Sequence, residues 1–193
     1  QMLDHFGDVA IGQLADLVSG GHVHHADGVA LDVDRACKLG ALAGHLGRNR
    51  EAWALAGLLH DLDVEVTNAD SHIHGPEGAR WLAEMGVDAD IVDAIAMHNE
   101  MATGKERTTE FQHALAAGET ITGLIMATAL VYPDKKIASV KTKSVTKRMK
   151  EKAFAASVKR ENILECEQIG IPLDTFATIA IAAMCEIADE IGL

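Results

Sequence analysis

The chain has 193 residues, is 48% hydrophobic and carries a formal net charge of −12 at pH 7. This length suits one domain whose core is large enough to fold without disulfides or a structural metal. The acidic balance argues against binding to a nucleic-acid polymer, which needs a broad basic face. Cys37, Cys166 and Cys185 lie far apart, so neither a zinc knuckle nor a disulfide framework is predicted, and a cytoplasmic location is expected.

Apolar residues recur at helical spacing along nearly the whole chain, and no alternating strand pattern occurs. We therefore predict an all-α fold in one domain over residues 1–193. The longest apolar stretch, residues 121–132, is interrupted by threonines and is too short to span a bilayer, so no membrane association is expected. The expected parts are an N-terminal helix and loop (1–30), a central core (31–131), and a basic segment with the C-terminal helices (134–193).

Turn and cap residues predict where the helices begin and end. Gly47 stops the second helix, and Asn49 can cap the next one. Pro76 suits the first turn of a helix, and Pro133 stops the longest helix. In chain order, helices are expected over about residues 3–18, 32–46, 50–60, 76–85, 88–98 and 111–131, then a short one in the basic segment, and finally over 161–169 and 174–191.

The most informative motif is His60-Asp61, which ends an apolar run over residues 53–59 and is followed by Asp63. A helix that is apolar on nearly every side has little reason to end in three polar side chains unless they meet a buried ligand. Imidazole and carboxylate together suit a divalent first-row metal ion. The motif therefore predicts a metal site, and we expect Asp63 and Glu65 to hold the His60 ring in place.

Further candidate ligands follow on separate elements. His74 precedes a predicted helix, His98 lies near the end of another, and Glu119 lies inside the longest one. Helical metal sites are usually assembled from side chains on facing helices. We therefore predict that the metal ligands are His60, Asp61, His74, His98 and Glu119, with Asp61 able to bridge two ions. Taken singly, His98 could equally be a surface histidine and Glu119 a solvated helix residue.

This series of residues resembles the HD-domain superfamily of metal-dependent phosphohydrolases over about residues 31–193, and it is most similar to small single-domain bacterial members. The motifs that carry the resemblance are Gly57-Leu-Leu-His-Asp-Leu-Asp63, His74-Gly, Gly78-Ala, His98-Asn99, Thr122-Gly-Leu-Ile125, Lys150-Glu-Lys-Ala-Phe-Ala-Ala156 and Arg160-Glu161. The resemblance implies an HD-domain helical bundle. It also implies a divalent cofactor, which could be Mn, Fe, Mg, Zn or Ni.

The chain departs from the superfamily at two ligand positions. The superfamily has its first ligand histidine on the helix before the dyad, where this chain has Leu31 or, with a shift of one residue, Asp32. The last ligand, usually aspartate, is Glu119 here. Another source of the missing imidazole would be the upstream histidines, which could instead form a polar loop: His22, His24 and His25.

Positive charge is concentrated in one segment. Residues 134–160 contain ten lysines and arginines against two acids. Cations in the first turns of a helix oppose the helix dipole, but together with the free N–H groups they make a good anion site. We therefore expect Lys147, Lys150 and Arg160 to bind substrate phosphate. The alternative is a solvated or internally neutralised surface.

Three functions fit these patterns. The first is hydrolysis of a nucleotide or another small phosphorylated metabolite, which the resemblance implies, with His60 and Asp61 as catalytic residues. The second is a non-catalytic scaffold that binds a nucleotide or a partner protein, which the missing first histidine favours. The third is a di-iron oxygenase, which would need a full six-ligand shell. No serine or cysteine nucleophile motif is found, and the chain is compatible with a homo-oligomer.

Overall fold

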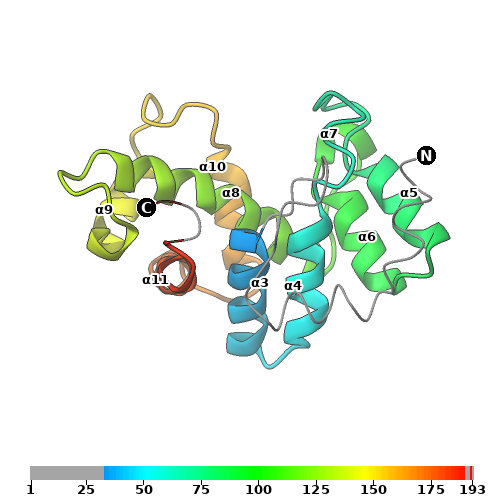
Figure 1. Ribbon diagram of the computed structural model, residues 1–193, viewed down its shortest axis with the longest axis horizontal. Helices are drawn as coiled ribbons and strands as arrows, with labels where there is room; N and C mark the ends of the chain where they lie inside the picture. Colours follow the sequence, from blue (N-terminus) through cyan, green and yellow to red (C-terminus); the bar gives the residue numbers. More distant parts are fainter. Residues whose placement is uncertain (1–32, 190–191, 193) are drawn as a thin grey trace.

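The structure is a computed structural model that describes residues 33–189 and 192. In these residues the secondary structure is helical and contains no strand (Figure 1). The predicted all-α fold is therefore confirmed. The expected helix over residues 3–18, the histidines between positions 22 and 25, and the alternative ligand positions 31 and 32 lie outside the described residues.

The helices follow the predicted order along the chain. They are α3 (Val33–Leu46), α4 (Arg50–Leu59), α5 (Pro76–Glu84), α6 (Ala89–Met97), α7 (Glu100–Thr103), α8 (Glu110–Leu130), α9 (Thr142–Arg148), α10 (Arg160–Leu164) and α11 (Leu173–Glu186), with the 3-10 turns η1 (Ile137–Ser139) and η2 (Glu165–Glu167). The short helix α7 lies in a segment expected to be a loop, because the Asn99 side chain caps it and Gly104 ends it with a positive φ of 62°. The expected helix over 161–169 is divided into α10 and η2, and α11 ends earlier than expected, at Glu186.

Side-chain caps also explain where α4 and α8 begin. The Asn49 side chain accepts hydrogen bonds from two backbone N–H groups in the first turn of α4, each at 3.1 Å, as its position in the sequence predicts. Thr109 and Gln112 form a reciprocal capping box at the start of α8. These local contacts satisfy N–H groups that have no partner inside the helix.

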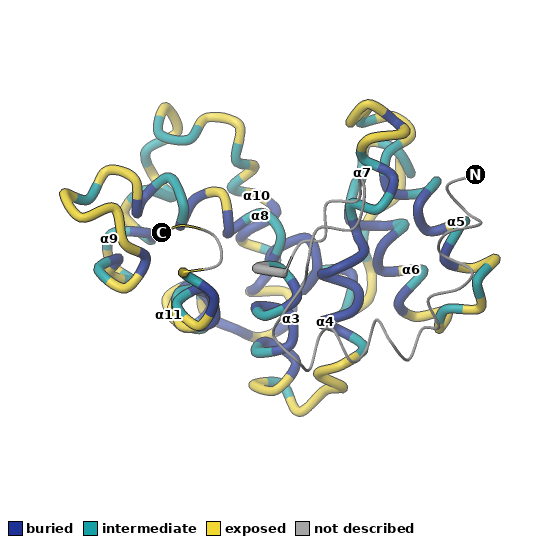
Figure 2. Tube along the Cα trace, viewed as in Figure 1, coloured by how far each residue is buried: buried dark blue, intermediate teal, exposed yellow. Residues whose placement is uncertain are grey.

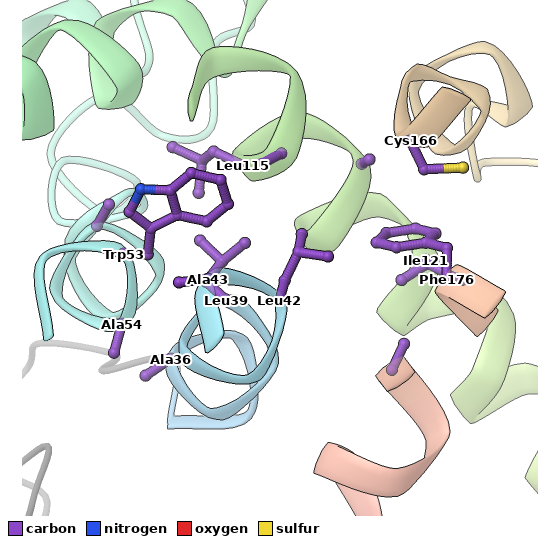
Figure 3. Close-up of a cluster of buried hydrophobic side chains, with 14 of the residues drawn as sticks. Ala36, Leu39, Leu42, Ala43, Trp53, Ala54, Leu115, Ile121, Cys166 and Phe176 are labelled. Carbon is purple, nitrogen blue, oxygen red and sulfur yellow. The ribbon is translucent and has the colours of Figure 1, made fainter. Parts of the chain in front are cut away.

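Helix α8 is the centre of the packing. It contacts α3, α4, α6, α9, α10 and α11, and Figure 2 shows many buried residues in α8 and in the helices around it. In Figure 3, Leu39 and Leu42 of α3 lie between Trp53 of α4 on one side and Phe176 of α11 on the other. All four side chains are at least 95% buried, and burial of each contributes roughly 1.5–3 kcal/mol to folding.

Among the described helices, α8 is long and apolar enough to cross a membrane by length and composition. The expectation that the stretch at 121–132 is too short therefore applied only to part of this element, since the helix itself has 21 residues. In the structure, 61% of the apolar window of α8 is buried. The helices packed around α8 cover this surface, as they do in the core helix of a folded domain.

Helices α3 and α4 lie side by side (Figure 1) and approach most closely at Gly57. A Cβ atom at Gly57 would lie 2.7 Å from the backbone oxygen of Arg35 and 3.0 Å from the backbone nitrogen of Ala36. Cβ atoms do not approach backbone atoms this closely, so only glycine permits this distance between the two helices. The contact brings Arg35 close to the end of α4, where the His60 motif begins.

We expect Gly57→Ala to lower the free energy of unfolding by about 1–3 kcal/mol, because its methyl group would overlap backbone atoms of α3. Gly40→Ala is the matched control. A Cβ there would meet the Ala54 Cβ at 3.4 Å, an ordinary contact, and alanine gains up to about 1 kcal/mol in a helix interior. Urea unfolding followed by circular dichroism measures both variants. Equal stabilities would contradict the close approach of α3 and α4 at Gly57.

Candidate metal centre

Three predicted ligands converge from separate parts of the chain. Asp61 follows the end of α4, His74 lies in the turn before α5, and His98 caps the end of α6. His74 Nε2 lies 2.9 Å from Asp61 Oδ1 and 3.2 Å from His98 Nε2, while His98 Nε2 lies 3.7 Å from Asp61 Oδ1. One ligand atom from each residue lies within 4.8 Å of the other two. The arrangement can hold a metal ion.

His60 lies beside this group and is fully buried. Its Nδ1 is 2.9 Å from the backbone oxygen of Gly57, and its Nε2 is 3.3 Å from Asp61 Oδ2. The His60 ring also packs edge-on against the His98 ring, with 5.1 Å between centroids. The carbonyl of Gly57 and the neighbouring rings therefore orient His60 toward Asp61.

Asp63 holds His74 rather than His60. Its Oδ1 accepts a hydrogen bond from His74 Nδ1 at 2.6 Å, and its Oδ2 accepts from the backbone N–H groups of Gly75 and Gly78 at 2.8 and 2.9 Å. The expectation that Asp63 and Glu65 support the His60 ring is therefore corrected: Asp63 is fully buried against the turn that carries His74, and Glu65 is exposed. With Nδ1 bonded to a carboxylate, Nε2 of His74 faces Asp61 and His98.

Asn99, which directly follows His98 in the sequence, also holds the turn that carries His74. Its Nδ2 donates to the backbone oxygens of Ser71 and His74, each at 2.9 Å. Gly75 adopts a φ of 100°, and a Cβ there would lie 2.8 Å from Cε1 of the His98 ring. Asn99 and Gly75 were not singled out as site residues, although the motifs His98-Asn99 and His74-Gly contained them. Together they bring His74 against His98.

The Arg107 side chain binds the backbone at the C-terminal end of α6. Its side chain is 5% exposed and donates to the backbone oxygen of Met97 at 3.0 Å and of His98 at 2.7 Å. The same guanidinium is paired with Glu100 and Glu165 at 2.7 and 2.8 Å. The last carbonyls of a helix have no intrahelical partner, so Arg107 satisfies them and keeps His98 in position.

The ionisable groups of the site influence one another's pKa. Burial disfavours charge on Asp61, but His60, His74 and His98 outweigh it and hold the pKa of the Asp61 carboxyl well below its usual range. Burial lowers the pKa of His98 to about 3. Burial also opposes charge on His74, but hydrogen bonds to Asp61 and Asp63 raise its pKa to about 10. An arriving cation therefore meets an ionised carboxylate and a neutral His98, and it must displace a proton from His74.

Glu119 reaches the same cavity but stands outside the close group of three ligands. It lies on α8 and lines the cavity together with His74 and His98. Burial raises the pKa of the Glu119 carboxyl, and the charge of Asp61 adds to this effect. The two carboxylates are therefore close enough to repel each other, although the close group of ligand atoms among the described residues comprises Asp61, His74 and His98 alone.

The cavity beside the ligands has a volume of about 310 Å³. Cations reach it from two places that the sequence analysis did not identify: Arg35 on α3 and Lys159 in the loop before α10. Arg35 could have been found from its spacing, because it lies four residues, about one helical turn, after Leu31, the position of the missing histidine. For Lys159 no comparable signal exists beyond its place in the basic segment.

The three cations predicted to bind phosphate do not line this cavity. The guanidinium of Arg160 donates to backbone oxygens of its own loop, including Ala155 at 2.6 Å and Val158 at 2.7 Å. Lys147 is 78% exposed and lies 3.7 Å from Glu151, and Lys150 is exposed. Arg160 therefore shapes the loop that presents Lys159, whereas the two lysines belong to the solvated surface of the basic segment.

Comparison with known proteins identifies the family of the chain. The family model described as HD domain matches residues 34–159, which include each of the five predicted metal ligands. Over 84 residues, 44% of this chain, the sequence is 32% identical to Ribonuclease Y 2 of Levilactobacillus brevis. The match covers 15% of that relative's length. No solved structure matches the chain. Since the family model covers most of the chain, the protein belongs to the HD-domain family, within the superfamily of metal-dependent phosphohydrolases.

Proposed function

We propose that this protein is a metal-dependent phosphohydrolase that acts on a nucleotide or another small phosphorylated metabolite. The observation that carries the proposal is the convergence of Asp61, His74 and His98 beside a cavity. One carboxylate and two imidazoles form a donor set that suits divalent first-row ions. The cofactor is accordingly a divalent ion, with Mn, Fe, Mg, Zn and Ni as candidates.

Asp61, His74 and His98 would hold this ion, and His60 and Glu119 would complete the set. The electrostatics of the site supports the assignment. Glu119 and Asp61 repel each other, and burial adds to the cost of charging Glu119. A cation bound beside the two carboxylates would remove this repulsion. The donor chemistry of the described residues therefore fits a metal ion.

A divalent ion bound here would supply a nucleophilic water near neutral pH and would take up negative charge on phosphoryl oxygens. The chain's own residues set the geometry. Asp63 keeps the His74 ring turned toward Asp61, and the Arg107 guanidinium holds the end of α6 so that His98 faces the same point. Ligands held by such outer contacts need little reorganisation when the ion or substrate binds.

The size and charge of the site favour a small substrate. The cavity volume of about 310 Å³ lies at the lower end of the range for small-molecule pockets. The relative from Levilactobacillus brevis is named a ribonuclease, which makes RNA an alternative substrate class. That protein is, however, much longer than the matched region. A net charge of −12 disfavours the broad phosphate contacts that a polymer requires.

A non-catalytic scaffold remains the second candidate. Arg35 lines the cavity next to the metal ligands, and a guanidinium cannot serve as a ligand itself. A nucleotide could therefore bind in the cavity without being hydrolysed. Metal content separates the two functions, because a scaffold of this kind would not depend on a stoichiometric metal ion.

We expect the purified protein without an affinity tag to contain near-stoichiometric divalent metal and to hydrolyse at least one member of a panel of phosphorylated metabolites. Asp61→Ala should lose the metal and reduce hydrolysis more than about 100-fold, since even the outer partners of metal ligands contribute about 10–100-fold. Glu65→Ala is the matched control, because Glu65 is a nearby but exposed acid. Elemental analysis and a phosphate-release assay measure both effects. Metal absent from the parent protein, or retained by Asp61→Ala, would contradict the proposal.

Metal affinity should also rise with pH. The pKa of His74, about 10 without metal, means that the ring is protonated throughout the neutral range. Metal binding releases that proton, so His74 by itself should make affinity increase by up to about tenfold per pH unit between roughly pH 6.5 and 8.5. His98, with a pKa of about 3, adds no dependence in this range. Competition against a chelating dye at several pH values measures the slope. A flat profile would show that His74 is not a ligand.

A further inference from the structure

One of the side chains that line the cavity is a cation and cannot serve as a metal ligand. Arg35 lines it together with His74, His98 and Glu119. Its position follows from the packing of α3 on α4, because Gly57 lets the Arg35 backbone approach closely and His60 lies one turn further along α4.

The chemistry of this side chain points to an anion. A guanidinium stays protonated and has no lone pair to offer a metal, but its N–H groups form a planar fork that matches two phosphoryl oxygens. A charge-assisted contact of this kind is about twice as strong as a neutral hydrogen bond. Placed beside ligands for a cation, Arg35 would meet the oxygens of a phosphoryl group that also contacts the metal.

We infer that Arg35 is the phosphate-binding residue of this site and that the substrate enters with a phosphoryl group between Arg35 and the metal ligands. The inference rests on the proposed function and names the part of the substrate that the cavity recognises. It also replaces the cations of the basic segment in that role, since Lys147 and Lys150 are absent from the cavity lining and Arg160 is engaged with its own loop.

Lys159 is a second, weaker cation of the same cavity. Its Nζ lies 2.8 Å from Glu100 Oε1, and its side chain is 48% exposed. The ion pair offsets part of its charge, and solvent screens the rest. Arg35 is less accessible to solvent than Lys159, so solvent screens its charge less. We therefore expect a larger contribution from Arg35.

The test is calorimetric titration of inorganic phosphate into the full-length Mn²⁺-loaded protein. Arg35→Gln should raise the phosphate Kd by at least about tenfold, the usual effect of losing a charged hydrogen bond. Lys147→Gln, which removes one positive charge outside the cavity, is the matched control and should change the Kd less than about twofold. Lys159→Gln should fall between these values. An unchanged Kd in Arg35→Gln, or no phosphate binding to the parent, would overturn the inference.

A second readout separates phosphate binding from a structural role. Removing a positive charge beside a cation site reduces repulsion, so Arg35→Gln should bind Mn²⁺ at least as tightly as the parent. Loss of both Mn²⁺ and phosphate affinity would mean that Arg35 only supports the fold of the site. If Arg35→Gln fails to fold, Arg35→Lys keeps the charge but not the fork. It should raise the phosphate Kd by a smaller factor, and a parental Kd would again overturn the inference.

The titration and an assay of hydrolysis together distinguish this inference from the proposed function. Phosphate binding that Arg35→Gln weakens, combined with no hydrolysis of any tested metabolite, would support the anion site and leave the protein as a binding scaffold. Hydrolysis with an unchanged Michaelis constant in Arg35→Gln would support the phosphohydrolase and reject Arg35 as its phosphate-binding residue.

Discussion

One buried carboxylate organises the candidate metal centre. Asp63 accepts hydrogen bonds from His74 Nδ1 and from the backbone N–H groups of Gly75 and Gly78. A single side chain thus fixes the orientation of a ligand, the turn that carries it and the first turn of α5. A buried carboxylate without such partners would cost several kcal/mol. The contacts that stabilise Asp63 in the interior are therefore the ones that direct His74 toward Asp61.

The second constraint is the close packing of α3 on α4. Because Gly57 has no side chain, the backbone of α3 passes where a Cβ atom would otherwise lie. This contact places Arg35 at the wall of the cavity that His74 and His98 also line. The candidate metal site and the proposed phosphate site are consequently neighbours through helix packing, although Arg35 and His98 are far apart in sequence.

Much of the site could be predicted because its residues carry local signals. The His60-Asp61 motif ends an unusually apolar helix, and His74 and His98 each lie at a helix boundary that glycine, proline or asparagine marks. The role of Asp63 was wrong, because proximity in sequence suggested His60 as its partner whereas the chain turns back and brings His74 against it. The structure brings ligand atoms of Asp61, His74 and His98 together, and the assignment of metal ligands stays a prediction for these three as for His60 and Glu119.

By itself the sequence determined the all-α fold, most helix boundaries and the presence of a metal-ligand motif, since helical periodicity, caps and ligand types are properties of short segments. Only the tertiary structure decided which cations reach the cavity. Counting charges pointed to the basic segment, yet Lys147 lies on the solvated surface and Arg35 lines the site. The physical reason is that a side chain's position depends on which helix faces pack together, and this depends on long-range contacts such as that of Gly57 with Arg35.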